Sequence, residues 1–232
     1  MSLVARHKTA VEFAVDEIKR RIVEQELRPG VRIDQDMIAE TLGLSRIPIR
    51  QALANLAGRG FVLLQAHRSA VVAPLSGAEL RDIYTLRCRM EPWAIEEVCA
   101  RFGETDFVVL DSLIEGMVQA ARNHDLARYM DLNREFHFAL FAGSGNPHLI
   151  RILQGLFDIS ERYQWVYVNA VGSMDRSNRE HSQILAVMRA RDHAGATALS
   201  VQHSQKTADW LRSNVIGDEL EGNTGNLEMA TK

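Results

Sequence analysis

The stretch LGLSRIPIRQALANLAGRGF, residues 42–61, decides how the first part of the chain folds. Ser45 is suited to capping a helix, and Pro48 then falls in the first turn, where its missing N–H leaves no helical hydrogen bond unmade. The Gly-Arg-Gly run at 58–60 would end that helix. The stretch therefore predicts a short amphipathic helix. Its core-facing residues recur at helical spacing: Ile49, Leu53 and Leu56.

Two arginines, Arg46 and Arg50, stand four residues apart at the start of this predicted helix. Residues at i and i+4 share one helical face, so both guanidinium groups would point the same way. The first turn of a helix also carries a partial positive charge that favours an anion. The pattern predicts either a solvated helix surface or a binding face for a negatively charged partner.

The elements on either side of this helix favour the second alternative. Apolar spacing predicts a helix over 9–26 and a second helix that Asp34 caps and Gly43 ends. FVLLQ at 61–65 and AVVA at 70–73 are β-prone runs joined by a short turn, which predicts a two-stranded ribbon. Three helices followed by a ribbon is the order of a winged helix-turn-helix.

In a helix-turn-helix, the second helix of the pair enters the DNA major groove with its first residues against bases and phosphates. Arginine pairs bidentately with guanine, and a basic ribbon tip reaches the minor groove. The sequence therefore predicts a DNA-binding face. Its candidate residues are Gln35, Ser45, Arg46, Arg50, His67 and Arg68.

The rest of the chain reads as helix up to a polar tail. Ser76 and Glu79 have the spacing of a capping box for the first of these helices, and Ser177 and Glu180 have it for a later one. An apolar stripe on the first helix is expected to face the core: Leu80, Ile83, Leu86, Met90 and Trp93. The predicted fold is mainly α. It comprises a winged helix-turn-helix domain over 1–75, an all-helical bundle over 76–216 and a disordered tail over 217–232.

Composition and charge narrow the function classes. With 46% hydrophobic and 25% charged residues, the chain has the composition of a folded globular protein. It contains no apolar run of the roughly 18–20 residues that a membrane span needs and no signal-peptide pattern, so we expect a cytoplasmic protein. Residues 1–74 hold eleven Lys and Arg against eight Asp and Glu, a net charge of +3 that leaves −6 for the remainder. This asymmetry is typical of a basic nucleic-acid reader joined to an acidic module.

Three histidines in the second part are placed so that they could meet. Asn133 and His137 lie one turn apart on an apolar helix. His181 and His203 lie on apolar faces of two later helices, each eleven residues from a turn near Asp192. Antiparallel packing of those helices would bring the two imidazoles to the same height. The two cysteines form no CxxC motif, so a thiolate site is not indicated.

A metal ion would satisfy several buried imidazoles at once. An unpartnered buried polar group costs about 1–3 kcal/mol, so these side chains need partners. Three histidines with an open position suit Zn²⁺, with Ni²⁺ or Mn²⁺ as alternatives. The other interpretation is that each histidine is hydrogen-bonded separately in the core. The predicted ligands are Asn133, His137, His181 and His203.

The N-terminal motifs resemble a known family. LRPG at 27–30, LGLSRIPIRQAL at 42–53 and the hairpin at 60–73 are similar to the DNA-binding domain of GntR-type bacterial transcription regulators, whose pattern contains a PG turn and an SRxPVRxAL helix. The resemblance implies that the candidate residues above contact an operator. Ser69 departs from the pattern, because the family often has glycine there.

Residues 78–214 resemble the helical effector domain called FCD, found in the FadR subgroup of that family. The domain's pattern of Asp or Asn, then His, then Glu-His, then a later His is met here, which implies a divalent metal site. Asn133 replaces the commoner Asp and removes one negative charge. The resemblance also implies a small organic-acid effector beside the metal. Arg87 matches a cavity arginine that could grip its carboxylate, unless Glu91 neutralises it, and Arg134 and Arg162 are weaker candidates.

These observations lead to one main functional interpretation and two alternatives. The main interpretation is a metabolite-responsive repressor that binds an inverted-repeat operator as a homodimer. A regulator that senses the metal ion itself is the first alternative. A metal-dependent hydrolase is the second. It is disfavoured because HExxH is missing and only Glu180 could serve as a general base. We therefore expect no enzymatic activity.

Overall fold

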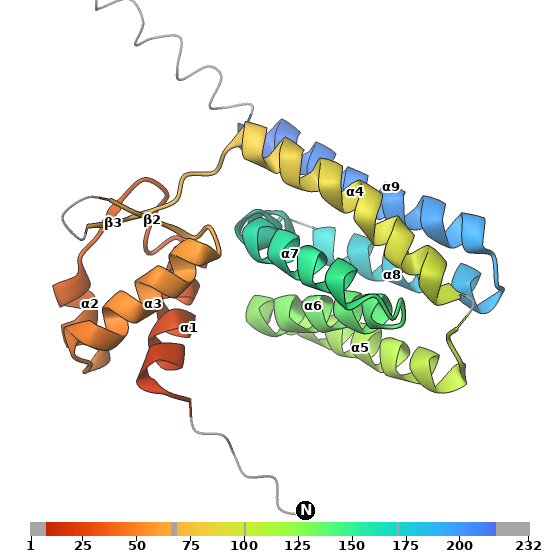
Figure 1. Cartoon of the computed structure of the whole chain (residues 1–232), viewed down its shortest axis with the longest axis horizontal. Helices are drawn as coiled ribbons and strands as arrows, with labels where there is room; N and C mark the ends of the chain where they lie inside the picture. The colour runs from red at the N-terminus through yellow and green to blue at the C-terminus, as the bar shows by residue number, and fades with distance from the viewer. Residues whose placement is uncertain (1–7, 66–68, 100, 171, 217–232) are drawn as a thin grey trace, which may run out of the picture. The chain divides into compact units, whose positions relative to one another are not determined.

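The computed structural model describes residues 8–65, 69–99, 101–170 and 172–216. The chain divides between Leu75 and Ser76 into two compact units (Figure 1). Their secondary structure confirms the predicted fold class, a winged helix-turn-helix followed by an all-helical bundle. Each unit is described by itself below.

The first unit folds around one apolar core. Its elements are α1 (Ala10–Val23), β1 (Arg32–Ile33), α2 (Gln35–Leu42), α3 (Arg46–Gly58), β2 (Val62–Leu64) and β3 (Ala70–Val72). Every helix contributes to the core, for example through Ile18, Ile38 and Leu53, all at most 1% exposed. Asp34 caps α2 through hydrogen bonds to the backbone N–H groups of residues 36 and 37, as predicted. Gly43 ends α2 in the left-handed conformation that glycine adopts most easily.

The structure corrects two predictions in this unit. The predicted two-stranded ribbon is a three-stranded antiparallel sheet of order β1-β3-β2, in which Ile33 pairs with Ala70. β1 is two residues long, too short for an alternating pattern to reveal it. In addition, α1 ends at Val23 rather than near Glu26, and Gln25 already has a positive φ of 62°.

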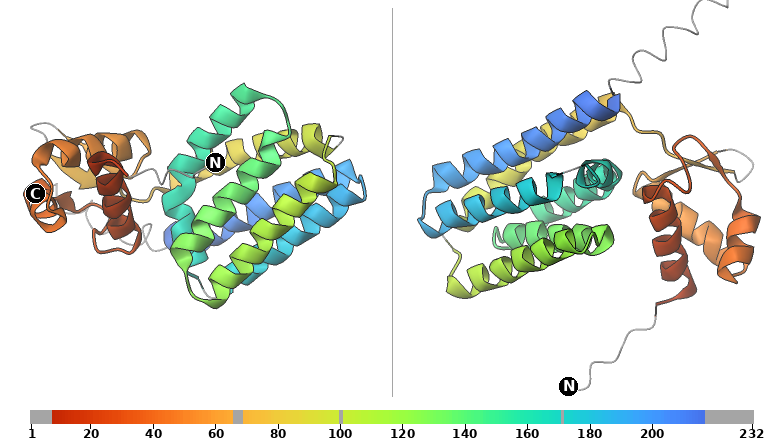
Figure 2. Two further views of the ribbon diagram at one scale, coloured as in Figure 1. Left: turned by 90° about the horizontal axis from the view of Figure 1, so that it is seen from below. Right: turned by 180° about the vertical axis from the view of Figure 1, so that it is seen from behind.

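The second unit is a bundle of antiparallel helices. Its elements are α4 (Gly77–Cys99), α5 (Glu104–Arg122), α6 (Leu126–Ala142), α7 (Pro147–Val168), α8 (Ser173–Arg189), α9 (His193–Leu211) and the π-helical turn η2 (Arg212–Ile216). α4 packs on α9, and α5 packs on α6 and α8 (Figure 1, Figure 2). This arrangement brings α6, α8 and α9, the helices that carry the three histidines, around one interior. No helix among the described residues is long and apolar enough to cross a membrane.

The predicted core stripe of α4 is partly wrong. Leu86 and Trp93 are 45% and 48% exposed, whereas Arg87 and Glu91 are 3% and 1% exposed. Because the buried face of α4 carries a charged pair, a pattern based on hydrophobicity assigns the wrong edge of the helix to the core. The face that the bundle buries therefore includes charged residues that hydrophobic periodicity leaves out of the core.

Two predicted capping boxes also differ from the structure. α8 begins at Ser173, so Ser177 and Glu180 lie inside the helix and form no cap. At the start of α4, the backbone N–H of Glu79 donates to Ser76, but the Glu79 carboxylate contacts Arg162 and Tyr163 instead of returning to the cap. The predicted tail over 217–232 lies outside the described residues.

Candidate nucleic-acid interface and metal centre

The start of α3 is arranged to meet an anion. Ser45 occupies the N-cap position, but its side chain makes no capping hydrogen bond, contrary to the prediction. Arg46 is 73% exposed and pairs with Asp36 of α2, with Nη2 2.7 Å from a carboxylate oxygen. An ion pair this exposed contributes only about 0–1 kcal/mol, so exchanging Asp36 for a phosphate costs little.

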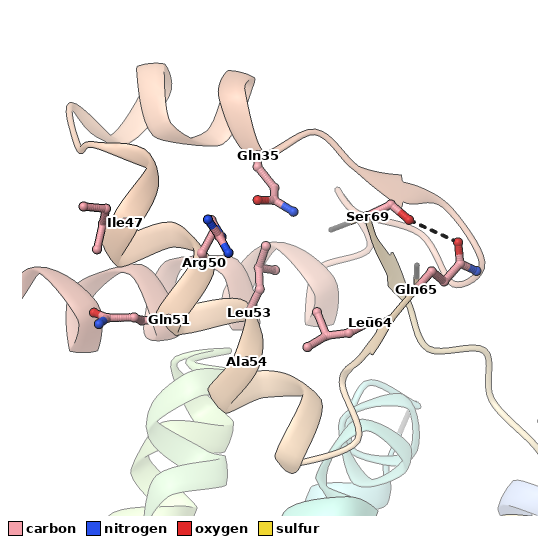
Figure 3. A pocket seen from close by; sticks show the side chains of 9 residues that line it. All are labelled: Gln35, Ile47, Arg50, Gln51, Leu53, Ala54, Leu64, Gln65 and Ser69. Atoms are coloured by element: carbon pink, nitrogen blue, oxygen red, sulfur yellow. Dashed lines mark hydrogen bonds between the residues drawn. The ribbon is translucent and has the colours of Figure 1, made fainter. Parts of the chain in front are cut away.

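A hollow of about 540 Å³ lies between α3 and the sheet (Figure 3). Gln35 and Arg50, both predicted DNA contacts, point into the same part of it. Arg50 is exposed, and it lies one turn after Arg46. The other two predicted contacts, His67 and Arg68 of the wing, lie outside the described residues.

The sequence prediction missed several residues around this hollow. Ile47 is 69% exposed and Leu64 is 54% exposed, although both are large and apolar. Gln51 follows Ile47 by one turn and lines the same hollow (Figure 3). Apolar side chains contact thymine methyl groups, and glutamine pairs bidentately with adenine. The available signal was helical spacing, which places Ile47 off the face that Ile49 and Leu53 direct toward the core.

The three histidines meet inside the second unit. His137 of α6, His181 of α8 and His203 of α9 are 5%, 0% and 8% exposed, and one ring nitrogen of each lies within 4.8 Å of the others. The Nε2 atoms of His181 and His203 are 3.3 Å apart. Phe136 and Phe157 contact these imidazoles and exclude water from one side.

The electrostatics of this cluster suit a cation held by neutral imidazoles. Burial lowers the pKa of His137 and of His181 well below the usual value, and the neighbouring histidines lower it further. Neutral imidazoles offer lone pairs, which is the form that binds metal. The Nδ1 of His181 is buried without a hydrogen-bond partner in the described part of the chain. The donor set therefore fits a divalent ion such as Zn²⁺.

A small polar cavity adjoins the histidines. It has a volume of about 30 Å³, and its lining includes His137, His203 and the half-buried Asn133, which is the fourth predicted ligand. Arg87 also lines it, but its Nε donates to Glu91 at 2.6 Å and its Nη1 donates to Ser160 at 3.0 Å. The guanidinium carbon lies 4.0 Å from the centre of the Phe157 ring.

The other two predicted effector residues do not reach this cavity. Arg134 pairs with Asp158 at 2.7 Å, and its guanidinium lies over Phe138. Arg162 contacts Glu79 near the start of α4. Neither arginine belongs to the cavity lining, so the structure gives no support to an effector-binding role for them.

The Glu180 carboxylate lies next to the cluster, whereas the sequence analysis assigned Glu180 to a helix cap and considered it otherwise only as a general base. Glu180 Oε2 accepts a hydrogen bond from Nδ1 of His203 at 2.8 Å, and Oε1 accepts one from the Lys206 ammonium at 2.9 Å. Burial raises the pKa of this carboxyl, but the hydrogen bonds from His203 and Lys206 outweigh burial and hold the pKa below its ordinary value. Glu180 therefore stays ionised beside a histidine of the cluster.

Two family models match the chain. Residues 10–72 match the model described as bacterial regulatory proteins, gntR family, and residues 82–206 match the FCD domain. These matches cover the helix-turn-helix and the helices that carry the histidines.

Curated relatives and solved structures agree with these matches. The Nta operon transcriptional regulator of Aminobacter aminovorans is 29% identical over 215 residues, covering 90% of this chain and 98% of the relative. The HTH-type transcriptional repressor GlaR of Escherichia coli is 26% identical over 194 residues, covering 80% of this chain and 88% of the relative. The structure of E. coli McbR/YncC matches with a TM-score of 0.73 at 21% identity, covering 89% and 98% of the two chains, and so shows a shared fold.

Proposed function

This chain belongs to the gntR family of bacterial regulatory proteins and carries an FCD domain, and on this premise we propose that it is a repressor controlled by a metal-assisted small-molecule site. Like its relatives, it is a DNA-binding transcription regulator and not an enzyme. We assign DNA binding to residues 1–75 and effector binding to residues 76–216, in a protein that acts on cytoplasmic DNA.

In this proposal α3 reads the operator. Ser45 and Arg46 contact phosphate at the start of the helix, Arg50 and Gln35 reach base edges, and the wing residues His67 and Arg68 reach the adjacent groove. Two copies of the chain bind an inverted repeat as a homodimer, because two DNA-binding domains related by a twofold axis match an operator with twofold symmetry. The exposure of Arg46 and Arg50 supports this assignment.

The observation that carries the effector proposal is the cluster of three buried histidines beside a polar cavity. His137, His181 and His203 hold a divalent ion, for which Zn²⁺ is the first candidate, and Asn133 offers an amide oxygen. The ion supplies a positive charge that attracts the carboxylate of a small organic acid. Arg87 contacts the same carboxylate once it gives up part of its bond to Glu91.

A thermal-melt screen tests this proposal. The purified protein is melted with a panel of small organic acids, before and after a chelator removes bound metal. An acid that raises the melting temperature only in the metal-loaded protein supports the proposal, because a ligand stabilises the state that it binds. As a second arm, His181→Ala should lower the metal content. An unchanged metal content in this variant removes His181 from the ligand set.

The cavity volume favours a second candidate function, a regulator that senses the metal itself. At about 30 Å³ the cavity is far smaller than the roughly 300–1,000 Å³ of small-molecule sites, although it accommodates an ion with a water molecule. Operator affinity that follows the Zn²⁺ concentration without any organic acid would favour this candidate. Operator affinity that responds to an acid at constant metal would favour the first.

A further inference from the structure

The imidazole of His203 is held at both edges by two consecutive residues of α8. Its Nε2 faces Nε2 of His181 at 3.3 Å, and its Nδ1 faces the Glu180 carboxylate at 2.8 Å. Consecutive residues on a helix point in different directions, so one segment of α8 reaches both sides of a single ring. His203 is the member of the cluster whose outer nitrogen meets a carboxylate, whereas the Nδ1 of His181 meets no partner in the described part of the chain.

A carboxylate at Nδ1 decides which nitrogen of His203 carries the proton. An ionised carboxylate only accepts hydrogen bonds, so Nδ1 must carry the hydrogen and Nε2 must present its lone pair toward His137 and His181. Glu180 is itself fixed, because its other oxygen pairs with Lys206, one turn after His203 on α9. The Glu180 side chain is only 9% exposed, so water competes little for these bonds.

We propose that Glu180 is a positioning residue that sets the tautomer and orientation of His203 for metal binding. This inference rests on the proposed metal site and adds to it a residue that would not touch the ion. Partners in this position generally change metal affinity by about 10–100-fold. The carboxylate also places negative charge next to a donor set of three imidazoles and the Asn133 amide, which carries none of its own.

Glu180→Gln tests the proposal, because Lys206 determines how the new amide is oriented toward His203. The new amide has one accepting oxygen, and the ammonium of Lys206 attracts that oxygen. The amide NH₂ then faces Nδ1 of His203 and donates to it, which forces the hydrogen onto Nε2, inside the cluster. In Glu180→Gln/Lys206→Met this competition disappears, and the amide oxygen can accept from Nδ1 again. Lys206 is 44% exposed, so removing it costs little by itself.

The experiment measures the Zn²⁺ affinity of the full chain by competition with a chromogenic chelator. We expect Glu180→Gln to weaken Zn²⁺ binding by about 10–100-fold. The double variant should recover most of that loss, and Lys206→Met alone should stay within about threefold of wild type. Glu79→Gln is the matched control, because it removes an ion-paired carboxylate of the same unit that does not contact a histidine.

Imidazole ¹⁵N chemical shifts of the metal-stripped protein give a second readout that a loss of stability would not reproduce. His203 should carry its proton on Nδ1 in the wild type and on Nε2 in Glu180→Gln. Unchanged Zn²⁺ affinity in Glu180→Gln, or a loss that Lys206→Met does not relieve, overturns the inference while the metal site stands. Failure of wild-type protein to bind Zn²⁺ overturns the metal site, and this inference with it.

Discussion

The two units of the protein place their polar chemistry in opposite locations. Among the described residues, every buried polar or charged side chain belongs to the second unit, where Arg87, Glu91 and the three histidines lie in the interior. The core of the first unit is apolar, and its functional candidates Arg46 and Arg50 lie on the surface. Long-range attraction to a polyanion needs exposed charge, whereas selective binding of an ion or small acid needs donors shielded from water. Arginine therefore lies on the surface of one unit and in the interior of the other.

We expect the largest change in stability from disrupting the buried ion pair between Arg87 and Glu91. Glu91→Ala leaves the Arg87 guanidinium buried with its main counter-charge removed, and we expect the free energy of unfolding of the second unit to fall by about 3–5 kcal/mol. All three tryptophans, Trp93, Trp165 and Trp210, lie in the second unit, so urea unfolding followed by tryptophan fluorescence reports on this unit alone.

The matched control removes the carboxylate of a surface pair in the first unit. Asp36→Ala removes the carboxylate that pairs with Arg46. Because both side chains are largely exposed, we expect the free energy of unfolding, measured by circular dichroism, to fall by about 1 kcal/mol or less. Equal losses in the two variants would contradict the contrast between interior and surface charge.

The next effect concerns DNA affinity. Arg50→Ala should weaken binding to the chain's own upstream DNA by about 1–3 kcal/mol, roughly 5–150-fold, since one charge-assisted contact is lost. The melting temperature should barely change, because Arg50 is exposed. Fluorescence anisotropy at fixed salt measures the affinity, and Arg122→Ala, an exposed cation on α5, is the control. A large fall in melting temperature would instead make Arg50 a structural residue.

The smallest effect is the acid dependence of a surface network in the first unit. Hydrogen bonds from Arg20 and Arg21 to Glu17 outweigh burial and lower the pKa of Glu17 to about 2. A lowered pKa in the folded state means that the unfolded chain binds the proton first, so this stabilisation is complete above about pH 4.5 and is lost as the pH falls toward 2. The difference in unfolding free energy between wild type and Glu17→Gln should therefore shrink only below about pH 4.5. A difference that already shrinks between pH 7 and 5 would contradict this assignment.

Sequence patterns predicted the first unit well because its information is local. Caps, glycine ends and apolar spacing place α2 and α3 within a residue or two, and the arginines follow from the spacing of α3. The error at β1 has a physical reason, since two residues become a strand only through pairing with β3. That Ile47 shares a hollow with Gln35 and Leu64 needed the structure, because these residues lie on three different elements.

In the second unit, most contacts between residues far apart in the chain could not be predicted from the sequence. Helix spacing correctly suggested that His181 and His203 would meet, because an antiparallel hairpin fixes their relative height. The Arg87–Glu91 pair is local, but Glu180, Arg87 and Arg162 also contact residues that lie 23, 73 and 83 positions away in the chain. No local pattern specifies these distant contacts. Capping rules assigned Glu180 to a helix start for the same reason.

The sequence by itself determined the order of the helices, the family and the arginines of the predicted DNA-binding face. Helix propensity, capping and residue spacing act over a few residues, so they can be read from the sequence. Only the tertiary structure decided which polar residues are buried together. Burial and pKa depend on all the elements packed around a group. A glutamate can cap a helix or accept a hydrogen bond from a buried histidine, and the neighbour that the fold supplies decides between the two.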